Sequence, residues 1–297
     1  MAFLSVLITI VPGDPARVIL GPRATPELTQ RVREVMDLDL SPIQQTFKFF
    51  QRLITGDLGN DVFSGRPILG IVTSVLPHTF ALAGAALLIA VGLGIPLGVL
   101  SATRPNSALD RVLSFMAVSF ITVPAYVTGL FALMLFSGAL RWLPTYGVGD
   151  GTAWSYILHL ITPAFVLALT WVGYLSRLVR NNLLEVMEQQ YVRTARAQGV
   201  SERRVLYKHA LRNALGPTVT VLGVGLGSLL AGAVFIEIIF SRPGLGSLLV
   251  NSIEARNYPV VRVATLFSAF LFVIANLLAD IVNALLDPRI RLEGGEE

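Results

Sequence analysis

Residues 185–215 read EVMEQQYVRTARAQGVSERRVLYKHALRNAL, a basic segment of helical character between two apolar stretches. Eight of the 23 Lys and Arg residues fall in the 36 positions that span this region. They are Arg177, Arg180, Arg193, Arg196, Arg203, Arg204, Lys208 and Arg212. Because loops rich in Lys and Arg stay on the cytoplasmic side of a membrane, this density predicts a cytoplasmic loop.

The same segment predicts two short helices with a sharp bend between them. Gly199 suits the left-handed position after a helix end, and Ser201 is a typical N-cap for a next helix with Glu202 in its first turn. The second helix has a basic stripe at a spacing of four: Arg204, Lys208 and Arg212. Small residues precede the bend: Thr194, Ala195 and Ala197. The pattern favours a docking surface for another protein, and the alternative is a loop that is basic only to fix topology.

Composition predicts an all-α integral membrane protein. The chain is 54% hydrophobic and 14% charged, with a mean hydropathy of +0.67. A helix needs about 20 apolar residues to cross a hydrocarbon core of about 30 Å. Five segments approach or exceed that length, namely 80–100, 112–140, 157–176, 213–236 and 263–279. We therefore expect five full transmembrane helices.

Charge then predicts the topology. If the basic segment is cytoplasmic, alternation places 101–111 and the tail 287–297 inside, and 12–76, 138–156 and 241–259 outside. Within 12–76, Ser41 and Pro42 predict a helix start, and an apolar stripe precedes Gly56. The stripe consists of Ile43, Phe47, Phe50 and Ile54. We interpret this amphipathic helix as lying over the outer mouth and packing on neighbouring spans.

Common catalytic motifs are missing from the sequence. Neither Lys48 nor Lys208 follows the glycine-rich spacing of a P-loop. The chain has no Cys, its three His residues lack metal-ligand spacing, and no Gly-x-Ser-x-Gly motif occurs. We expect a non-enzymatic protein that binds no cofactor or metal of its own.

The run YVRTARAQG at 191–199 and HALRN at 209–213 resemble the coupling loop of the dipeptide and oligopeptide class of ABC importer permeases. Further runs match that family in the same order: PGDP at 12–15, GDLG at 56–59, GIPLG at 94–98, LP at 143–144, PGLG at 243–246 and LDPRIR at 286–291. Each run alone is weak, but the ordered set is specific and spans nearly the whole chain.

The resemblance implies the type I ABC importer permease fold, which has six transmembrane helices in the family pattern. Residues 1–11 are apolar but reach only about 16 Å, so we expect a partial first transmembrane helix that follows from a late start or truncation rather than a genuine half-span. A signal peptide is disfavoured, because no basic n-region precedes this run. An extracytoplasmic segment would follow at 12–76, a transmembrane domain at 77–286 with a coupling loop at 185–213, and a cytoplasmic tail at 287–297.

The resemblance also implies the partners and the docking residues. A second homologous permease, two ATPase subunits or one fused ATPase, and an extracytoplasmic solute-binding protein would assemble with this chain in the cytoplasmic membrane of a bacterium or archaeon. ATP and Mg²⁺ would bind the ATPase subunits, and no nucleic acid is expected. The residues implied to contact the ATPase are Tyr191, Arg193, Thr194, Ala195, Arg196, Ala197, Gly199 and Arg204. Arg193 and Arg212 stand where the broader importer pattern has Glu and Pro, so the roles of that Glu and Pro are not transferred.

Two features of the span at 213–236 and its end are candidates for the permease interface or the path. Gly223 and Gly227 have the small-xxx-small spacing that lets helices pack closely, and Gly232 extends that small face. Glycine is also simply common in membrane helices. Glu237 is a candidate because intramembrane acids are costly, and the alternative is a structural pair or a position near water.

Cargo and mechanism have alternatives at this stage. The resemblance implies alternating access for di- or oligopeptides, with nickel or another small solute as a second cargo class. An ion-coupled secondary transporter would predict repeated halves with central acids, which the sequence lacks. A membrane scaffold or receptor would not need a glycine-rich span.

Overall fold

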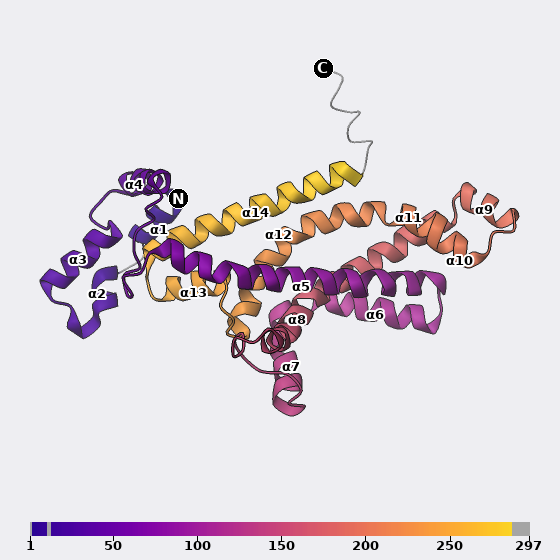
Figure 1. The fold of residues 1–297 in the computed structure, drawn as a ribbon, viewed down its shortest axis with the longest axis horizontal. Helices are drawn as coiled ribbons and strands as arrows, with labels where there is room; N and C mark the ends of the chain where they lie inside the picture. The colour runs from indigo at the N-terminus through magenta and orange to yellow at the C-terminus, as the bar shows by residue number, and fades with distance from the viewer. Residues whose placement is uncertain (1, 11–12, 287–297) are drawn as a thin grey trace, which may run out of the picture. The chain divides into compact units, whose positions relative to one another are not determined.

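The computed structural model describes residues 2–10 and 13–286, which form helices joined by loops (Figure 1). These residues divide into two compact units. Unit 1 comprises the described residues of Met1–Thr79 and Pro243–Leu271, and unit 2 comprises Phe80–Arg242 and the described residues of Phe272–Glu297. The long helices α5 (Ile68–Thr103) and α14 (Tyr258–Leu286) contribute to both units. The predicted tail 287–297 lies outside the described residues.

Unit 1 contains short helices besides the first parts of α5 and α14. They are α1 (Ala2–Ile10), α2 (Pro15–Leu20), the 3-10 turn η1 (Gly21–Arg23), α3 (Pro26–Met36), α4 (Pro42–Thr55) and α13 (Leu245–Glu254). Ser41 and Gln44 form a capping box at the start of α4, and Gly56 ends the helix with φ +75°. The predicted bounds of this amphipathic helix are therefore confirmed.

The buried face of α4 differs from the expected one. Phe49 packs against the first turns of α5 and α14, and the buried Gln45 accepts a hydrogen bond from Arg262 of α14 at 2.5 Å. The apolar stripe of Ile43, Phe47, Phe50 and Ile54 is between 45% and 87% exposed. The helix does pack on neighbouring spans, but with the opposite face, because the buried Arg262 guanidinium requires a polar partner.

The loop before α5 is fixed by a buried carboxylate. Asp61 accepts hydrogen bonds from the Ser64 backbone N–H at 2.8 Å and the Ser64 hydroxyl at 2.5 Å, and the Asn257 side-chain amide also donates to it. Burial raises the pKa of Asp61, but these hydrogen bonds to the charged form outweigh burial and leave the pKa below its ordinary value.

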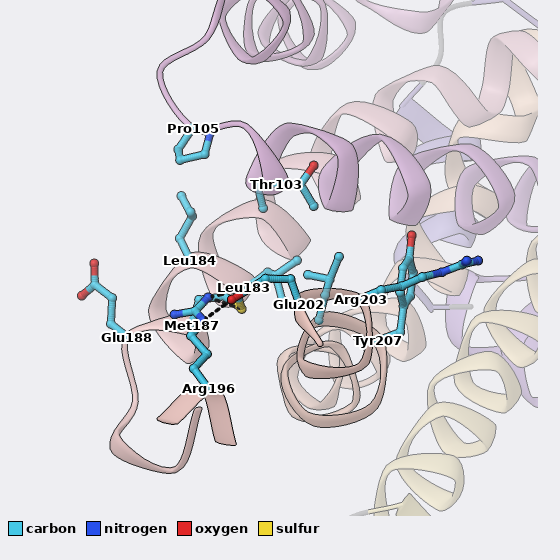
Figure 2. Close-up of a pocket in the computed structure, with 12 residues that line it drawn as sticks. Thr103, Pro105, Leu183, Leu184, Met187, Glu188, Arg196, Glu202, Arg203 and Tyr207 are labelled. Carbon is cyan, nitrogen blue, oxygen red and sulfur yellow. Dashed lines mark hydrogen bonds and ion pairs between the residues drawn. The ribbon is translucent and has the colours of Figure 1, made fainter. Parts of the chain in front are cut away.

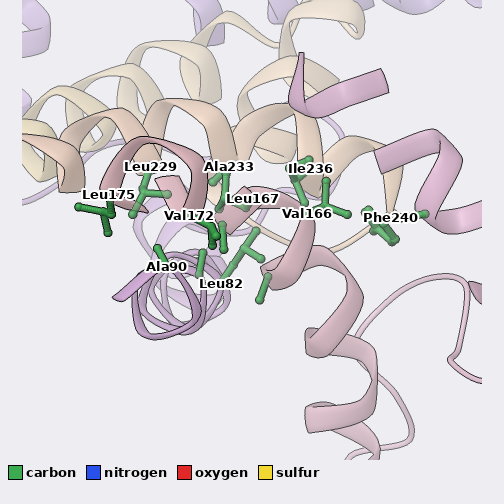
Figure 3. Packing of buried hydrophobic residues seen from close by; sticks show 14 residues of the cluster. Leu82, Ala90, Val166, Leu167, Val172, Leu175, Leu229, Ala233, Ile236 and Phe240 are labelled. Atoms are coloured by element: carbon green, nitrogen blue, oxygen red, sulfur yellow. The ribbon is translucent and has the colours of Figure 1, made fainter. Parts of the chain in front are cut away.

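Unit 2 is organised around the 35-residue helix α8 (Ala153–Met187). Its other elements are α6 (Ala108–Thr122), α7 (Ala125–Ala132), the π-helix η2 (Leu133–Ala139), α9 (Gln190–Ala197), α10 (Glu202–Arg204), the π-helix η3 (Val205–Ala210), α11 (Leu211–Ala214) and α12 (Gly216–Ile239). Helix α8 contacts α6, α7 and α12. The core in Figure 3 draws on α5, α8 and α12, with Leu82, Val172 and Ile236 among its buried side chains.

Two glycines let α5 approach α8 closely. A Cβ on Gly94 would lie 2.9 Å from the Leu175 Cβ, and one on Gly98 would lie 2.6 Å from the Ser176 carbonyl oxygen. These glycines belong to the GIPLG run and have the small-xxx-small spacing. This part of the run therefore has a packing role.

Three described helices are long and apolar enough to cross a membrane unbroken, and two bent pairs raise the number to five if each pair is one span. The unbroken spans are Ile68–Thr103, Ala153–Met187 and Tyr258–Ile281. Helix α12 bends by 52° between Gly216–Gly223 and Gly227–Ile239. The five predicted segments thus all fall on apolar helices, but two of these are not straight rods.

The sharpest bend replaces the uninterrupted span expected at 112–140. Ala108–Thr122 and Ala125–Ala139 meet at 105°, as the turn from α6 to α7 in Figure 1 shows. Pro124 disfavours helical backbone at the preceding residue, and Val123 accordingly has φ −78° and ψ 121°. Hydropathy alone does not report this local effect.

Candidate functional site

The basic segment folds as a hairpin, residues 190–214, whose bend is a Schellman motif. Helix α9 ends at Ala197, and Gly199 has φ +81°. The Gly199 N–H donates to the Arg196 carbonyl at 2.9 Å, and the Val200 N–H donates to the Ala195 carbonyl at 3.2 Å. This pair of bonds defines the motif and requires left-handed backbone at Gly199, so the predicted bend is confirmed.

An ion pair joins the two arms of the hairpin. Arg196 Nε lies 2.8 Å from Glu202 Oε1, and Figure 2 shows this contact among the side chains that line a cavity. Ser201 has the extended backbone of an N-cap, but its side chain makes no capping hydrogen bond. Glu202 in the first turn therefore contributes mainly by holding Arg196.

Apolar contacts close the hairpin from inside. Val192, Ala195 and Val205 form a buried cluster, with Val200 packed against it. Ala195 is thus inside the hairpin, where its small side chain lets the two arms approach. The remaining predicted docking residues are exposed: Tyr191, Arg193, Thr194, Arg196, Ala197, Gly199 and Arg204.

The second arm departs from a regular α-helix. Residues 205–210 form the π-helix η3, so Arg204, Lys208 and Arg212 do not follow an α-helical stripe, although all three are exposed. A hollow of about 440 Å³ lies over Ser201, Arg203, Arg204 and Tyr207. The exposed surface here is basic and has an aromatic residue at its edge.

The hairpin is packed onto the long helices rather than suspended from them. Ala210 and Ala214 of its second arm are buried against Val99 of α5 and against Val179 and Leu183 of α8. Asn182 donates to the Ala214 carbonyl at 3.3 Å. The Tyr191 hydroxyl accepts a hydrogen bond from Asn213 at 2.8 Å, which ties the start of the first arm to the end of the second.

A cavity of about 850 Å³ separates the rest of the hairpin from the α5–α6 turn. Apolar side chains line it, among them Leu183, Met187 and Leu206, together with the ion pair of Arg196 and Glu202. Figure 2 shows Arg196 and Glu202 next to Met187. The hairpin is therefore anchored at its base and is less constrained near its bend.

A buried ion pair near this cavity was not predicted. Arg180 of α8 donates through Nε and Nη2 to the two carboxylate oxygens of Asp110 in α6, at 2.7 Å each. Ser101 of α5 also donates to Asp110, which is 3% exposed. The sequence groups Arg180 with the basic residues of the cytoplasmic loop, whereas in the structure its ion pair joins α8 to α6. The sequence feature that could have indicated a buried ion pair is Asp110, an acidic residue between two apolar stretches.

The small face of α12 packs within this chain. A Cβ on Gly223 would lie 2.7 Å from the Ala279 Cβ of α14, and one on Gly227 would lie 2.7 Å from the Phe272 ring. A Cβ on Gly232 would lie 3.2 Å from a Leu167 methyl of α8. The close approach that these glycines permit is with α14 and α8, and contact with a second permease stays a prediction.

Glu237 is 1% exposed and interacts electrostatically with Arg242, which is also buried. Arg242 Nη1 donates to the His159 carbonyl at 2.9 Å and to the Gly147 carbonyl at 3.2 Å. Pro163 lies four residues after His159 inside α8 and has no N–H to satisfy that carbonyl. The guanidinium therefore replaces the missing helix hydrogen bond, which favours the structural alternative for Glu237.

Across residues 2–10 and 13–286, no group of three or more His, Asp or Glu side chains could hold a metal ion. The described geometry is one of helix packing and an exposed basic hairpin.

The fold is that of a type I ABC importer permease. The structure matches a chain of the inward-facing MetNI methionine ABC transporter with a TM-score of 0.62 and 18% identity, covering 74% of this chain and 98% of that one. It also matches an amino acid ABC transporter structure with a TM-score of 0.56 and 15% identity, over 72% of this chain and 94% of that one.

Residues 94–292 match the family described as the inner membrane component of binding-protein-dependent transport systems, and the chain belongs to that family. It is 39% identical to the oligopeptide transport system permease protein AppB of Bacillus subtilis, over 96% of this chain and 92% of AppB. It is 38% identical to the probable D,D-dipeptide transport system permease protein DdpB of Escherichia coli, over 97% and 91%. The glutathione transport system permease protein GsiC of Shigella flexneri is 37% identical, over 95% and 90%. The resemblance drawn from the coupling loop is thus confirmed, and the chain is a multi-pass membrane permease.

Proposed function

We propose that this chain and a second homologous permease form the path for di- or oligopeptides in an ATP-driven importer. Its relatives are named for oligopeptide, D,D-dipeptide and glutathione transport, and all three cargoes are small peptides. The observation that best supports the proposal is the hairpin 190–214, whose base is packed onto α5 and α8 while its bend is exposed.

This geometry suits mechanical coupling. Two ATPase subunits, or one fused ATPase, would hold ATP and Mg²⁺ and contact the exposed residues around Gly199. When they close, a displaced hairpin would move α8, because α8 leads directly into α9 and is buried against α11. Rotation of α8 would also move α6 through the Asp110–Arg180 pair, giving alternating access.

The proposal fixes an orientation. The hairpin and the tail 287–297 lie in the cytoplasm, and the segment 13–67 lies outside, where a solute-binding protein would deliver cargo. The density of exposed arginines on the hairpin supports this orientation.

Uptake by the reconstituted importer tests the cargo and the energy source. Proteoliposomes that contain the permeases, ATPase and binding protein should accumulate a labelled dipeptide or tripeptide only with internal ATP. Accumulation of ⁶³Ni²⁺ without competition by peptide would show the other cargo class. Peptide uptake driven by an ion gradient without ATP would instead show a secondary transporter.

Cross-linking tests the docking surface independently of cargo. Because the native chain has no Cys, Thr194→Cys gives a unique thiol on the hairpin, and Thr55→Cys at the end of α4 is a matched exposed control. We expect a bifunctional thiol–amine reagent to join the ATPase to the thiol at position 194 and not to the thiol at position 55. Equal cross-linking at both positions would refute the assignment.

A further inference from the structure

Helix α4 has three chemically distinct faces. Its first face, with Gln45 and Phe49, is buried against α5 and α14. The second is the exposed apolar stripe of Ile43, Phe47, Phe50 and Ile54. Gln51 lies on a third, polar and exposed face, roughly a quarter turn from the stripe. A helix with one face buried in protein, one exposed apolar face and one exposed polar face has the pattern expected at a membrane boundary.

The contacts of α4 place it beside the first turns of two long helices. Phe49 belongs to a buried cluster with Ile68 and Val72, in the first two turns of α5, and with Val260 and Val263, in the first two turns of α14. Both helices are candidate membrane spans that begin at this level. Helix α4 is therefore held beside the first turns of two candidate membrane spans.

The neighbouring α1 continues the apolar surface. Helix α1 contacts α4 and contains no charged residue, and its Phe3, Val6 and Leu7 are exposed. Apolar side chains of this kind face lipid on membrane helices, so α1 adds exposed apolar surface on a helix that contacts α4.

Charge on α4 fits anionic headgroups. The sequence PIQQTFKFFQRLIT contains two cations and no acid. Lys48 and Arg52 are both positioned by Asp37, at 2.5 and 2.8 Å, and remain partly exposed. Asp37 thus orients both cations, and the helix keeps a net positive charge.

We propose that α4 lies in the bilayer interface, with Ile43, Phe47, Phe50 and Ile54 inserted among the acyl chains and Lys48 and Arg52 at the level of anionic headgroups. The helix then anchors segment 13–67 at the membrane surface. Its apolar stripe is covered by lipid, neither by a second permease nor by a binding protein.

Site-directed fluorescence quenching tests this position. Single-Cys variants Ile43→Cys, Phe47→Cys and Gln51→Cys, each labelled with a small fluorophore, are reconstituted with their partner subunits in vesicles of phosphatidylethanolamine and phosphatidylglycerol. Because all three positions are exposed, the labels do not require repacking of the protein. We expect nitroxide-labelled lipid to quench positions 43 and 47 roughly threefold more than position 51, and aqueous iodide to show the reverse order.

Two results would overturn the proposal. Quenching of positions 43 and 47 by iodide as strongly as position 51 would place the stripe in water. Protection of both positions from lipid and iodide alike would show that a protein covers the stripe. The readout is the position of the label and not uptake, so it is independent of the proposed cargo.

Discussion

Replacing Gly199 by Asp or by Asn tests whether the bend of the hairpin is a contact surface. Gly199 has φ +81°, and a Cβ at this position would meet no other heavy atom within 4 Å. Within the chain, each replacement therefore costs only the strain of left-handed backbone, about 1 kcal/mol, which Asn and Asp tolerate better than other residues. The two side chains are nearly isosteric and differ by one negative charge.

The free-energy cost of the Asp charge in an interface with a docked ATPase should be larger than the cost of this backbone strain. An uncompensated charge enclosed in an interface costs about 3–5 kcal/mol, whereas about 1.4 kcal/mol corresponds to a tenfold change in rate. Gly199→Asp should therefore lower ATP-driven uptake by more than tenfold, and Gly199→Asn should lower it much less. Both variants should enter the membrane in wild-type amounts.

The assay is ATP-dependent peptide uptake in proteoliposomes, together with recovery of the ATPase on purification of the permease. Wild-type uptake by Gly199→Asp would refute the contact. An equal loss of uptake in the Asp and Asn variants would attribute the effect to backbone strain.

Three further predictions concern stability of the detergent-purified complex. Gly98→Ala should destabilise it by about 1–3 kcal/mol, because the new Cβ would meet the backbone of α8. The control is Gly92→Ala on the same helix, whose Cβ would meet nothing within 4 Å and which should leave stability unchanged. Equal melting temperatures of the two variants would contradict this prediction. Arg242→Met should lower stability by about 1 kcal/mol less in a Pro163→Ala background than in the wild type, because residue 163 regains an N–H that can donate to the His159 carbonyl. Additive effects in a thermal double-mutant cycle would disprove that Arg242 replaces this helix hydrogen bond. The pKa of Asp61 is lowered, so its carboxylate stabilises the fold at pH values above the ordinary pKa, and this stabilisation disappears as the pH falls through the lowered pKa. Asp61→Asn should therefore reduce the loss of thermal stability at acid pH that calorimetry measures. An unchanged acid dependence of stability would exclude Asp61 as its source.

Local features of the fold and of the hairpin were predictable because their causes are local. A left-handed glycine after a helix, a capping box at Ser41 and a helix break before Pro124 each depend on a few consecutive residues. The break at Pro124 was missed even so, because hydropathy is averaged over a window longer than the turn. The residues predicted to dock the ATPase came from the same local pattern together with the resemblance, and their docking role stays a prediction.

Long-range pairings could not be read in the same way. Asp110 and Arg180 are 70 positions apart, and Gln45 and Arg262 are 217 apart. Sequence spacing does not specify which buried charge meets which partner, because the pairing depends on how the helices pack. For the same reason, the sequence groups Arg180 with the loop charges and predicts a buried stripe on α4 that the structure leaves exposed.

The sequence alone determined that the chain crosses a membrane and that a bent basic hairpin lies between two spans, because transfer into lipid and helix capping act on contiguous residues. Tertiary structure alone decided which side of each helix is covered. It turned Ala195 into the hairpin, set Gly223 against α14 and left Phe47 exposed. Burial depends on neighbours brought together by folding, and an amphipathic helix in a membrane protein has two apolar media, protein and lipid, that its sequence does not distinguish.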